Sequence, residues 1–413
     1  MPFRTIVIVL VSILVQLLCV GPSAAGIKVW LVHSSHTGGH RAAANALAKA
    51  LVELPDVEAE VINTMDYLPS AMKTLQEKGF SLVTKLFPGL KRKAFESSIE
   101  GKEAAVSQAT RWLAVKAYFT RPLLERIRQE RPDIIVSSHS QTNVILGIWK
   151  KHGKITIPLH CVVTDYNTHA MWAHPYVDRY YVATEFVGSR LEHFGVSPER
   201  ITVTGIPVSP SFARVPSSTS EETRRLLNLD PTLPTVVMMG GSLGYGPYVD
   251  VAKALEEQGR PVQLLAMTGK NETVRAELDA LMPTLTNVNL YTYGFVDKMF
   301  RFMDAADAVI TKPGGLTVTE LLCRRKPMIL IKPSPGLESH VAGAIAQLGV
   351  AEVCQSPEEG AQKALEEATD KELQDMRLVA IDKVARPDAV FAIAHDVKLS
   401  AEGARSTSAS DQE

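Results

Sequence analysis

The sequence has few cysteines and almost no net charge. Its 413 residues contain four cysteines, whose spacing matches neither a disulfide framework nor a set of metal ligands. So few cysteines favour a protein adapted to a reducing compartment. With 44 lysines and arginines against 45 acidic residues, the formal net charge is −1, so the chain lacks the basic excess of a nucleic-acid-binding protein.

Long apolar runs are absent except at the N-terminus. There, Ile6–Val20 is apolar apart from Ser12 and Gln16, and Gly21–Gly26 is a patch of small residues. A run of ~15 residues is short for a membrane-spanning helix and suits a signal peptide. We predict that residues 1–26 are a cleaved signal peptide, a retained membrane anchor, or the product of a start codon placed too far upstream. Export would conflict with the scarcity of cysteine, and the sequence leaves that conflict open.

From Ile27 onward, short β-rich apolar runs alternate with amphipathic stretches. The expected strands are 28–33, 57–62, 133–137, 158–164, 180–183, 201–204, 235–239, 263–267, 288–291, 308–310 and 328–331. This alternation predicts parallel sheets with helices on both faces. A Pro- and Ser-rich stretch near residues 205–220 divides it. We therefore predict an α/β protein of two doubly wound domains, residues 27–212 and 213–396, and a disordered tail at 397–413.

The stretch Val309–Glu320 reads as a strand, a Pro-Gly-Gly turn and the start of a helix. Gly314 and Gly315 allow backbone amides to approach a ligand closely. The unpaired amides and the positive end of the helix dipole suit a phosphate group. Glu320 follows within the helix and can accept hydrogen bonds from sugar hydroxyls. The pattern indicates a nucleotide-sugar site, with an ordinary tight turn as the alternative.

Two further turns carry candidate chemistry in the first half of the chain. Ser34–Ala44 holds two glycines before His40 at a helix start, where a neutral imidazole can take a proton from a hydroxyl. A histidine that only caps or packs the turn is the alternative. Val163–His174 contains Asp165, which can orient a hydroxyl or an imidazole, and Trp172, which can stack on a sugar or an acyl chain. The spacing of the two histidines in this stretch does not favour a metal site.

One segment departs from the alternation. Phe80–Lys93 interleaves apolar and aromatic residues with basic ones, which suits an anionic membrane surface. The same character continues at Arg111, Trp112, Lys116, Tyr118, Phe119 and Arg121. A surface helix with solvated lysines is the alternative.

Taken together, these motifs resemble the family of diacylglycerol glycosyltransferases, which includes bacterial processive diacylglycerol glucosyltransferases and plant-type monogalactosyldiacylglycerol synthases. The resemblance covers residues 27–369, and the bacterial branch is the more similar. The matching blocks are 34–41, 164–184, 204–207, 240–244 and 311–320, the last followed by 335–338.

The resemblance implies a GT-B fold, with two Rossmann-like domains that face a central cleft. It also implies inverting transfer of a hexose from UDP-glucose or UDP-galactose to the hydroxyl of diacylglycerol. No cofactor and no metal are expected, because backbone amides and a helix end stabilise the leaving diphosphate. The expected location is the cytoplasmic face of the cell membrane, against an anionic lipid surface, unless the N-terminal segment directs export.

The resemblance also implies the roles of particular residues. His40 and Asp165 are the expected catalytic residues, with His40 as the base or as the residue that positions it. The expected donor-binding residues are Gly241, Ser242, Lys312, Gly314, Gly315, Thr317, Glu320 and Glu338. The expected acceptor-binding residues are Gly39, Tyr166, His169 and Trp172.

The sequence departs from the family pattern at two places. The loop before His40 has one residue fewer than the usual Thr-Gly-Gly-Gly-His. The usual Pro-Gly-Gln-Glu motif has Leu337 in place of glutamine, and Val341 stands where an asparagine is usual. Leucine cannot bond sugar hydroxyls, so the sugar stays open. A nucleotide-sugar epimerase on the same fold, and a non-catalytic descendant that binds lipid or nucleotide, are the alternatives.

Overall fold

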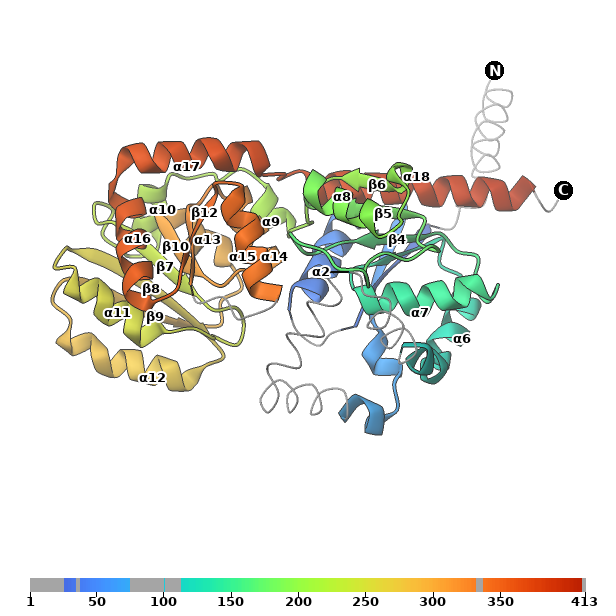
Figure 1. Ribbon diagram of the computed structural model, residues 1–413, viewed down its shortest axis with the longest axis horizontal. Helices are drawn as coiled ribbons and strands as arrows, with labels where there is room; N and C mark the ends of the chain where they lie inside the picture. The colour runs from blue at the N-terminus through green and yellow to red at the C-terminus, as the bar shows by residue number, and fades with distance from the viewer. Residues whose placement is uncertain (1–25, 35–37, 75–99, 101–112, 332–336, 411–413) are drawn as a thin grey trace, which may run out of the picture.

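The protein folds around two six-stranded parallel sheets (Figure 1). The computed structural model describes residues 26–34, 38–74, 100, 113–331 and 337–410. The first sheet has the order β2-β1-β3-β4-β5-β6 and the second the order β12-β11-β10-β7-β8-β9. The predicted pair of doubly wound domains is therefore confirmed. The added edge strand β12 was not predicted.

The observed strands follow the predicted runs closely. The first sheet contains β1 (Ile27–His33), β2 (Val57–Asn63), β3 (Ile134–Ser137), β4 (Leu159–Val162), β5 (Arg179–Val182) and β6 (Ile201–Val203). The second contains β7 (Thr235–Met239), β8 (Val262–Gly269), β9 (Val288–Gly294), β10 (Ala308–Thr311), β11 (Met328–Ile331) and β12 (Ala351–Cys354).

Helices cover both faces of the first sheet. They are α2 (Gly39–Leu51), α6 (Arg121–Glu130), α7 (Ser140–Lys151) and α8 (Glu185–His193), with the short turns η1 (Thr64–Tyr67) and η2 (Pro198–Arg200). Successive strand residues point to opposite faces. In β1, Val29 and Leu31 therefore pack with α2, whereas Trp30 and Val32 pack with α6 and α7.

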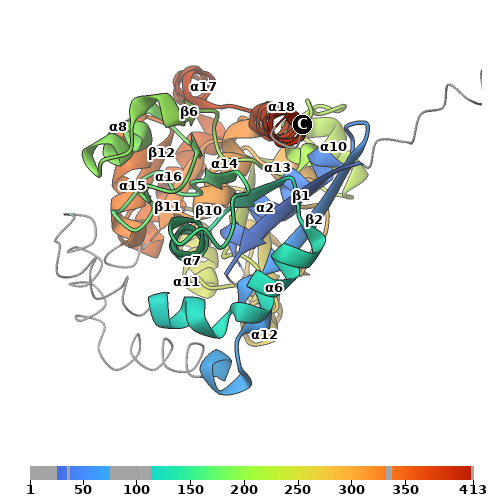
Figure 2. The same cartoon turned by 90° about the vertical axis from the view of Figure 1, so that its right-hand side faces the viewer.

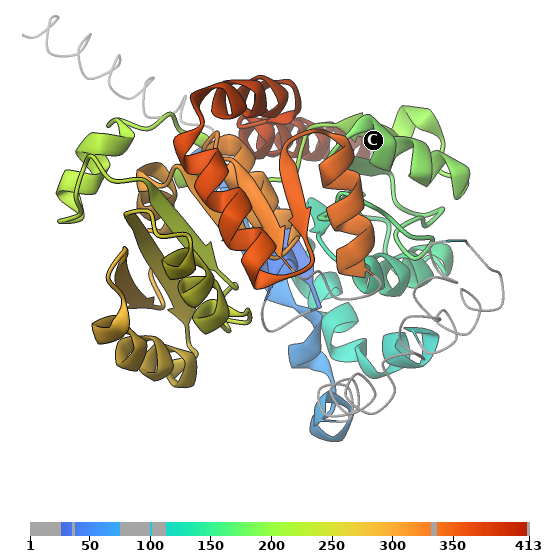
Figure 3. The same cartoon turned by 60° about the vertical axis from the view of Figure 1, so that its left-hand side comes forward.

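The second sheet is covered in the same way. Its domain contains α9 (Pro210–Ala213), α10 (Ser220–Leu226), α11 (Tyr248–Glu257), α12 (Glu272–Leu281), η3 (Met282–Thr284), α13 (Met299–Ala305), α14 (Gly315–Cys323), α15 (Leu337–Gln347), α16 (Pro357–Thr369) and α17 (Lys371–Val384). Residues of α11, α12 and α16 pack on one face, and residues of α13, α14 and α15 on the other. The latter face shares one hydrophobic cluster with the first domain. In Figure 3 the orange helix α15 lies on the side of the second domain that faces the first.

The chain crosses between the domains twice, and the two crossings touch. Gly205 has φ +92, and a Cβ there would lie 2.7 Å from the Cβ of Arg386 on the return crossing. Only glycine combines this positive φ with such close contact. The residues after Arg386 form α18 (Ala389–Ser410), which packs back on α2 and on the first sheet. Figure 2 shows α18 above that sheet and α6 and α7 below it.

The prediction of a disordered tail at 397–413 is wrong for the residues up to Ser410, which belong to α18. Val397 and Ala401 are buried against the first domain, and Arg405 donates to the carboxylate of Asp133 at 2.6 and 2.7 Å. The Ser- and Ala-rich composition gave no sign of the apolar stripe on this helix, which is buried only because the first domain packs against it. Helix α18 thus packs the end of the chain against the first domain.

Two predictions lie outside the described residues. These are the signal peptide or anchor within 1–26, of which only Gly26 is described, and the basic and apolar segment Phe80–Lys93. In the part of the chain that the structure describes, no helix has both the length and the apolar character needed to cross a membrane.

Candidate active site

The predicted donor residues meet at the point where the second sheet reverses its strand order. β7 pairs with β10 on one side and β8 on the other, so the loops after β7 and β10 leave the same edge side by side. Gly241 and Ser242 follow β7, and Lys312 and Gly314 follow β10. Ligands of doubly wound sheets bind at this reversal. A Cβ at Gly241 would lie 3.8 Å from Cε of Lys312, so the two loops are in contact.

Helix α14 begins at this edge without a side-chain N-cap. Its N-cap is Gly314, which has no side chain to bond the first amides. Among the described residues, nothing accepts from the amides of Gly315, Leu316 and Thr317. By contrast, Thr184 caps α8 and Ser356 caps α16. The first turn of α14 therefore presents free amides and the positive end of its dipole, which together suit a phosphate.

Glu320 lies further along α14 with a carboxylate that makes no hydrogen bond or ion pair among the described residues. Burial raises the pKa of Glu320 to about 8. A partly desolvated carboxylate without a partner is an acceptor that a ligand hydroxyl can satisfy. Glu338, the other predicted carboxylate, is the second residue of α15 and is half-buried. Residues 332–336 and the Leu337 side chain lie outside what the structure describes.

On the opposite side of the cleft, His40 is the second residue of α2. Ser138 makes hydrogen bonds to both the side chain and the backbone of His40. Its Nδ1 lies 2.9 Å from the carbonyl oxygen of Ser138, and the Ser138 hydroxyl donates to the His40 carbonyl at 2.9 Å. Thr164 Oγ1 also lies 2.8 Å from Nδ1. A carbonyl can only accept, so neutral His40 carries its proton on Nδ1 and leaves the Nε2 lone pair open. This is the tautomer that a general base needs. The N-cap is Gly38, so His40 does not cap the helix.

The β4–β5 loop, residues 163–178, brings the other acceptor residues to His40. Trp172 lies with its ring centroid 6.0 Å from that of His40, and its indole Nε1 donates to Asp165 Oδ2 at 3.2 Å. Burial raises the pKa of Asp165, and the nearby His40 opposes that shift. Burial also lowers the pKa of His169 to about 4, so its imidazole is neutral at pH 7. Trp172 is fully buried, so its predicted stacking face is covered by its neighbours.

Three buried oxygens in or beside this loop have no partner among the described residues: Asn143 Oδ1, Asn167 Oδ1 and Thr168 Oγ1. Asn143 also donates to the carbonyl of Trp172 at 3.2 Å, which fixes the loop. A buried oxygen without a hydrogen bond costs about 1–3 kcal/mol. Hydroxyl groups of a ligand or of water would satisfy these atoms.

The donor and acceptor halves touch each other at three points. A Cβ at Gly315 would lie 2.3 Å from the carbonyl oxygen of Thr164, and a Cβ at Gly39 would lie 3.6 Å from Cβ of Leu316. The Tyr166 hydroxyl lies 2.9 Å from Thr319 Oγ1. Tyr166, predicted to bind the acceptor, is buried and bonds the donor helix instead. The predicted residues of both domains therefore converge on one cleft.

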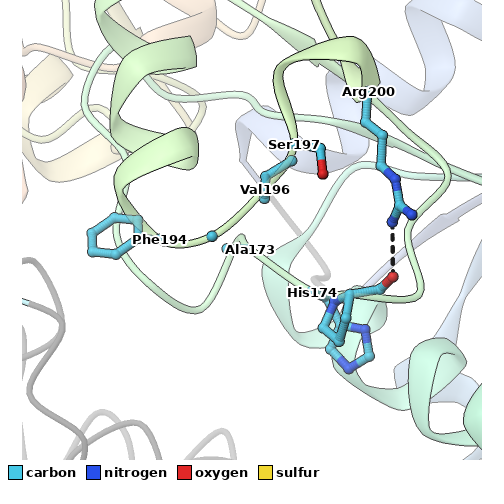
Figure 4. A pocket seen from close by; sticks show the side chains of 8 residues that line it. Ala173, His174, Phe194, Val196, Ser197 and Arg200 are labelled. Atoms are coloured by element: carbon cyan, nitrogen blue, oxygen red, sulfur yellow. Dashed lines mark hydrogen bonds between the residues drawn. The ribbon is translucent and has the colours of Figure 1, made fainter.

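A separate cavity of about 340 Å³ lies at the far end of the β4–β5 loop (Figure 4). It is lined by Ala173, His174, Pro175, Phe194, Gly195, Val196, Ser197 and Arg200. Figure 4 shows Arg200 reaching across to the loop, where its Nη1 donates to the Pro175 carbonyl at 2.9 Å. No predicted site residue lines this cavity, so it lies apart from the cleft.

Sequence reasoning missed the residues that hold His40. Ser138 and His139 follow β3, the neighbour of β1 in the sheet, and the His40 and His139 rings have centroids 4.4 Å apart. The signal was present in the sequence, because polar residues directly follow a buried strand. The described residues contain no group of three or more metal-ligating side chains arranged for an ion. The absence of a metal requirement stays a prediction.

Two family models match the chain. The model described as monogalactosyldiacylglycerol (MGDG) synthase matches residues 40–208, and the glycosyltransferase family 28 C-terminal domain matches residues 235–383. A probable chloroplastic monogalactosyldiacylglycerol synthase of Glycine max is 32% identical, over 90% of this chain and 71% of that protein. The enzyme of Spinacia oleracea is 32% identical over 90% and 72%. Monogalactosyldiacylglycerol synthase 1 of Arabidopsis thaliana is 30% identical over 90% and 70%.

Solved structures share the fold at lower identity. Acinetobacter baumannii MurG has a TM-score of 0.57 and 17% identity over 90% of this chain and 99% of its own. S. aureus MnaA, solved with UDP, has a TM-score of 0.56 and 16% identity over 90% and 96%. At these identities the likeness establishes the GT-B fold alone. The predicted preference for the bacterial glucosyltransferase branch stays a prediction.

Proposed function

We propose that this chain, which belongs to the monogalactosyldiacylglycerol synthase family, transfers a hexose from a UDP-sugar to the hydroxyl of diacylglycerol. UDP-galactose is the donor we propose first, because the names of the relatives specify a galactosyl product. The observation that carries the proposal is the convergence of an uncapped helix start and a histidine with an open Nε2 in one cleft.

In the proposed reaction, Nε2 of His40 takes the proton of the diacylglycerol hydroxyl. The hydroxyl oxygen attacks the anomeric carbon while the bond from that carbon to the diphosphate breaks on the opposite face. Attack from the opposite face inverts the configuration of that carbon. UDP leaves with the bonding electrons, and the free amides of α14 together with Lys312 stabilise its growing negative charge.

Asp165 and Glu320 have separate tasks in this proposal. Asp165, held by the Trp172 indole, faces the charge that forms on His40 when it accepts the proton. Glu320 accepts hydrogen bonds from ribose hydroxyls, which would explain a carboxylate left without a partner in the described residues. Gly241 and Ser242 border the diphosphate from the loop after β7.

We further propose that the first domain docks on a membrane surface beside this cleft. In the helical residues 113–119, Val115, Tyr118 and Phe119 are exposed, and Arg121 lies with its guanidinium carbon 4.1 Å from the Tyr118 ring centroid. Aromatic side chains beside a cation suit the lipid headgroup region. A location on the cytoplasmic face of the cell membrane stays part of the proposal.

A transfer assay tests the proposed function. Purified protein is incubated with UDP-galactose or UDP-glucose and diacylglycerol micelles, and the lipid fraction is analysed for glycolipid. A galactolipid supports the proposal with its first donor, and a glucolipid supports the transfer with the other sugar. An isomerised nucleotide-sugar without a lipid product would instead indicate an epimerase. Nucleotide binding without turnover would indicate a non-catalytic protein.

Liposome flotation tests the docking surface. Replacing Tyr118 and Phe119 by serine should weaken binding to vesicles that contain anionic lipid, because it removes the apolar contact. Leu226→Ser provides the matched control, since Leu226 is 75% exposed on the second domain. Equal flotation of the double variant and the control would rule out this surface.

A further inference from the structure

Lys116 is a buried lysine close to the candidate base. It is 1% exposed and lies in the helical residues 113–119. The sequence analysis placed it among the basic residues of a membrane-facing segment, and that placement is wrong. Val115, Tyr118 and Phe119 of the same helix face solvent, whereas Lys116 points into the first domain. Helical spacing puts this lysine on the inner face, which composition alone does not reveal.

The ammonium group joins the carboxyl ends of three neighbouring strands. Lys116 Nζ donates to Ser34 Oγ at 3.0 Å, just after β1, and to Gln141 Oε1 at 2.9 Å, near the start of α7 after β3. It also lies 3.7 Å from Sδ of Met65, just after β2. No carboxylate among the described residues pairs with it. A buried charge without a counter-ion is unfavourable, and a methionine would fill similar space without that penalty.

Both polar partners of Lys116 are connected to His40, one along the chain and the other through hydrogen bonds. Ser34 directly follows β1 and stands six residues before His40 in the chain. The backbone amide of Gln141 donates to Nδ1 of His139 at 3.1 Å. The carbonyl of Ser138, the residue before His139, accepts from Nδ1 of His40. The ammonium therefore joins the end of β1 to the segment after β3 that orients the base.

The charge of Lys116 acts on His139, which lies in a group of imidazoles at this edge of the sheet. His33 lies at the end of β1, His40 on α2, His139 before α7 and His169 in the β4–β5 loop, and Asp165 is the acid among them. Burial lowers the pKa of His139 well below its ordinary value, and the charges of His40, Lys116, His169 and His33 add to that shift. Burial lowers the pKa of Lys116 itself to about 8, so the lysine carries its charge at neutral pH and disfavours a second charge on His139.

We propose that Lys116 is a positioning residue for the transfer reaction, which fixes Ser34 after β1 and Gln141 at the start of α7 and so holds the segment of Ser138 and His139 that orients His40. The proposal rests on His40 being the base of the proposed function. Lys116 is too deeply buried to touch a substrate. Its effect therefore falls on the rate and on the pH dependence of the reaction, and not on the affinity for the UDP-sugar.

The first test is Lys116→Met, which removes the charge and both hydrogen bonds at similar volume. We expect kcat to fall about tenfold while KM for the UDP-sugar stays within about twofold, as for a group that acts only on the reacting geometry. The acidic limb of the pH–rate profile should move to higher pH, because His139 loses a repelling charge and protonation of its Nδ1 would remove the acceptor of the Gln141 backbone amide. Lys49→Met removes the same charge from an exposed position on α2 and should change neither quantity.

Gln141→Met separates positioning from charge, since it removes one partner of the ammonium and leaves the charge in place. It should lower kcat without moving the acidic limb. A Lys116→Met enzyme with a reduced rate and an unmoved limb would overturn the proposal and leave a purely structural lysine. Loss of transfer in the wild-type protein, or full activity in His40→Ala, would count against the proposed function instead.

Should Lys116→Met fail to fold, the wild-type protein itself supplies the test. Long-range proton–nitrogen spectra of protein labelled on histidine report the protonation of each ring. The proposal requires the His139 ring to stay neutral well below the ordinary histidine pKa, in line with the lowered pKa of that group. Titration of His139 near the ordinary histidine value would overturn it.

Discussion

In the second domain the groups that face the cleft are mainly backbone amides and glycines, with the side chains of Lys312 and Glu320 beside them, whereas in the first they are imidazoles and a carboxylate from separate segments. The main part of the donor half, the turn and helix start at residues 312–320, is continuous in the chain, and the loop after β7 borders it. The acceptor half depends on residues 40, 138 and 165, which meet only in the folded protein. A backbone site tolerates side-chain changes and is broken by an added Cβ. A site made of side chains is broken by removing one group.

The largest expected effect comes from His40→Ala in the acceptor half. Removing a general base lowers kcat by about 10²–10⁴-fold. Affinity for UDP, measured by calorimetry, should be unchanged, because the donor half does not use this side chain. His152→Ala, at an exposed position after α7, is the matched control and should retain activity. A His40→Ala enzyme within tenfold of the wild-type rate would exclude this residue as the base.

Gly315→Ala should disrupt the donor half by adding a methyl group. The new methyl group would lie 2.3 Å from the carbonyl oxygen of Thr164, so the start of α14 must shift away from the first domain. A displacement of about 1 Å at a reacting centre lowers the rate about 10²-fold, and the change should appear in kcat/KM for the UDP-sugar. Gly343→Ala on α15 is the control, because its methyl group would meet no atom within 4 Å. Equal activity of the two variants would show that the contact at Gly315 is not required.

This contrast explains which parts could be predicted from the sequence. The strands and the Pro-Gly-Gly turn follow from local patterns, so the doubly wound fold and the position of α14 were predicted correctly. The roles of Ser138 and Lys116 depend on the pairing of β1 with β3 and on which helix face is buried, and neither is local in sequence. Likewise α18 became recognisable only through the first domain that it covers.

Glu320 allows a test of the donor half through pH. Its pKa of about 8, raised by burial from 4.5, means that the protonated form is favoured in the unliganded protein. Its contribution to stability is therefore fully present below pH 4.5 and is lost as the pH rises through 8. Ribose hydroxyls would donate to the ionised carboxylate and lower this pKa. Binding of UDP near pH 7 should then release a proton and strengthen as the pH approaches 8.

Calorimetry of UDP binding in two buffers with different ionisation enthalpies measures this proton release. Glu320→Gln should abolish the release and weaken UDP binding about tenfold, since it removes one charge-assisted hydrogen bond. An unchanged proton release in Glu320→Gln would assign the proton to another group and remove Glu320 from the ribose site.

The smallest expected effect belongs to the hydrogen bond that joins the two halves. Tyr166→Phe and Thr319→Val each remove one partner of the contact between the β4–β5 loop and α14. One such bond contributes about 0.5–1.5 kcal/mol, so each variant should lower kcat/KM only a few-fold. If the bond couples the halves, the double variant should lose little more activity than either single variant, which a double-mutant cycle measures. Additive losses would mean that the two hydroxyls act separately, Tyr166 on the acceptor loop and Thr319 within α14, where it also donates to the Gly315 carbonyl at 2.8 Å.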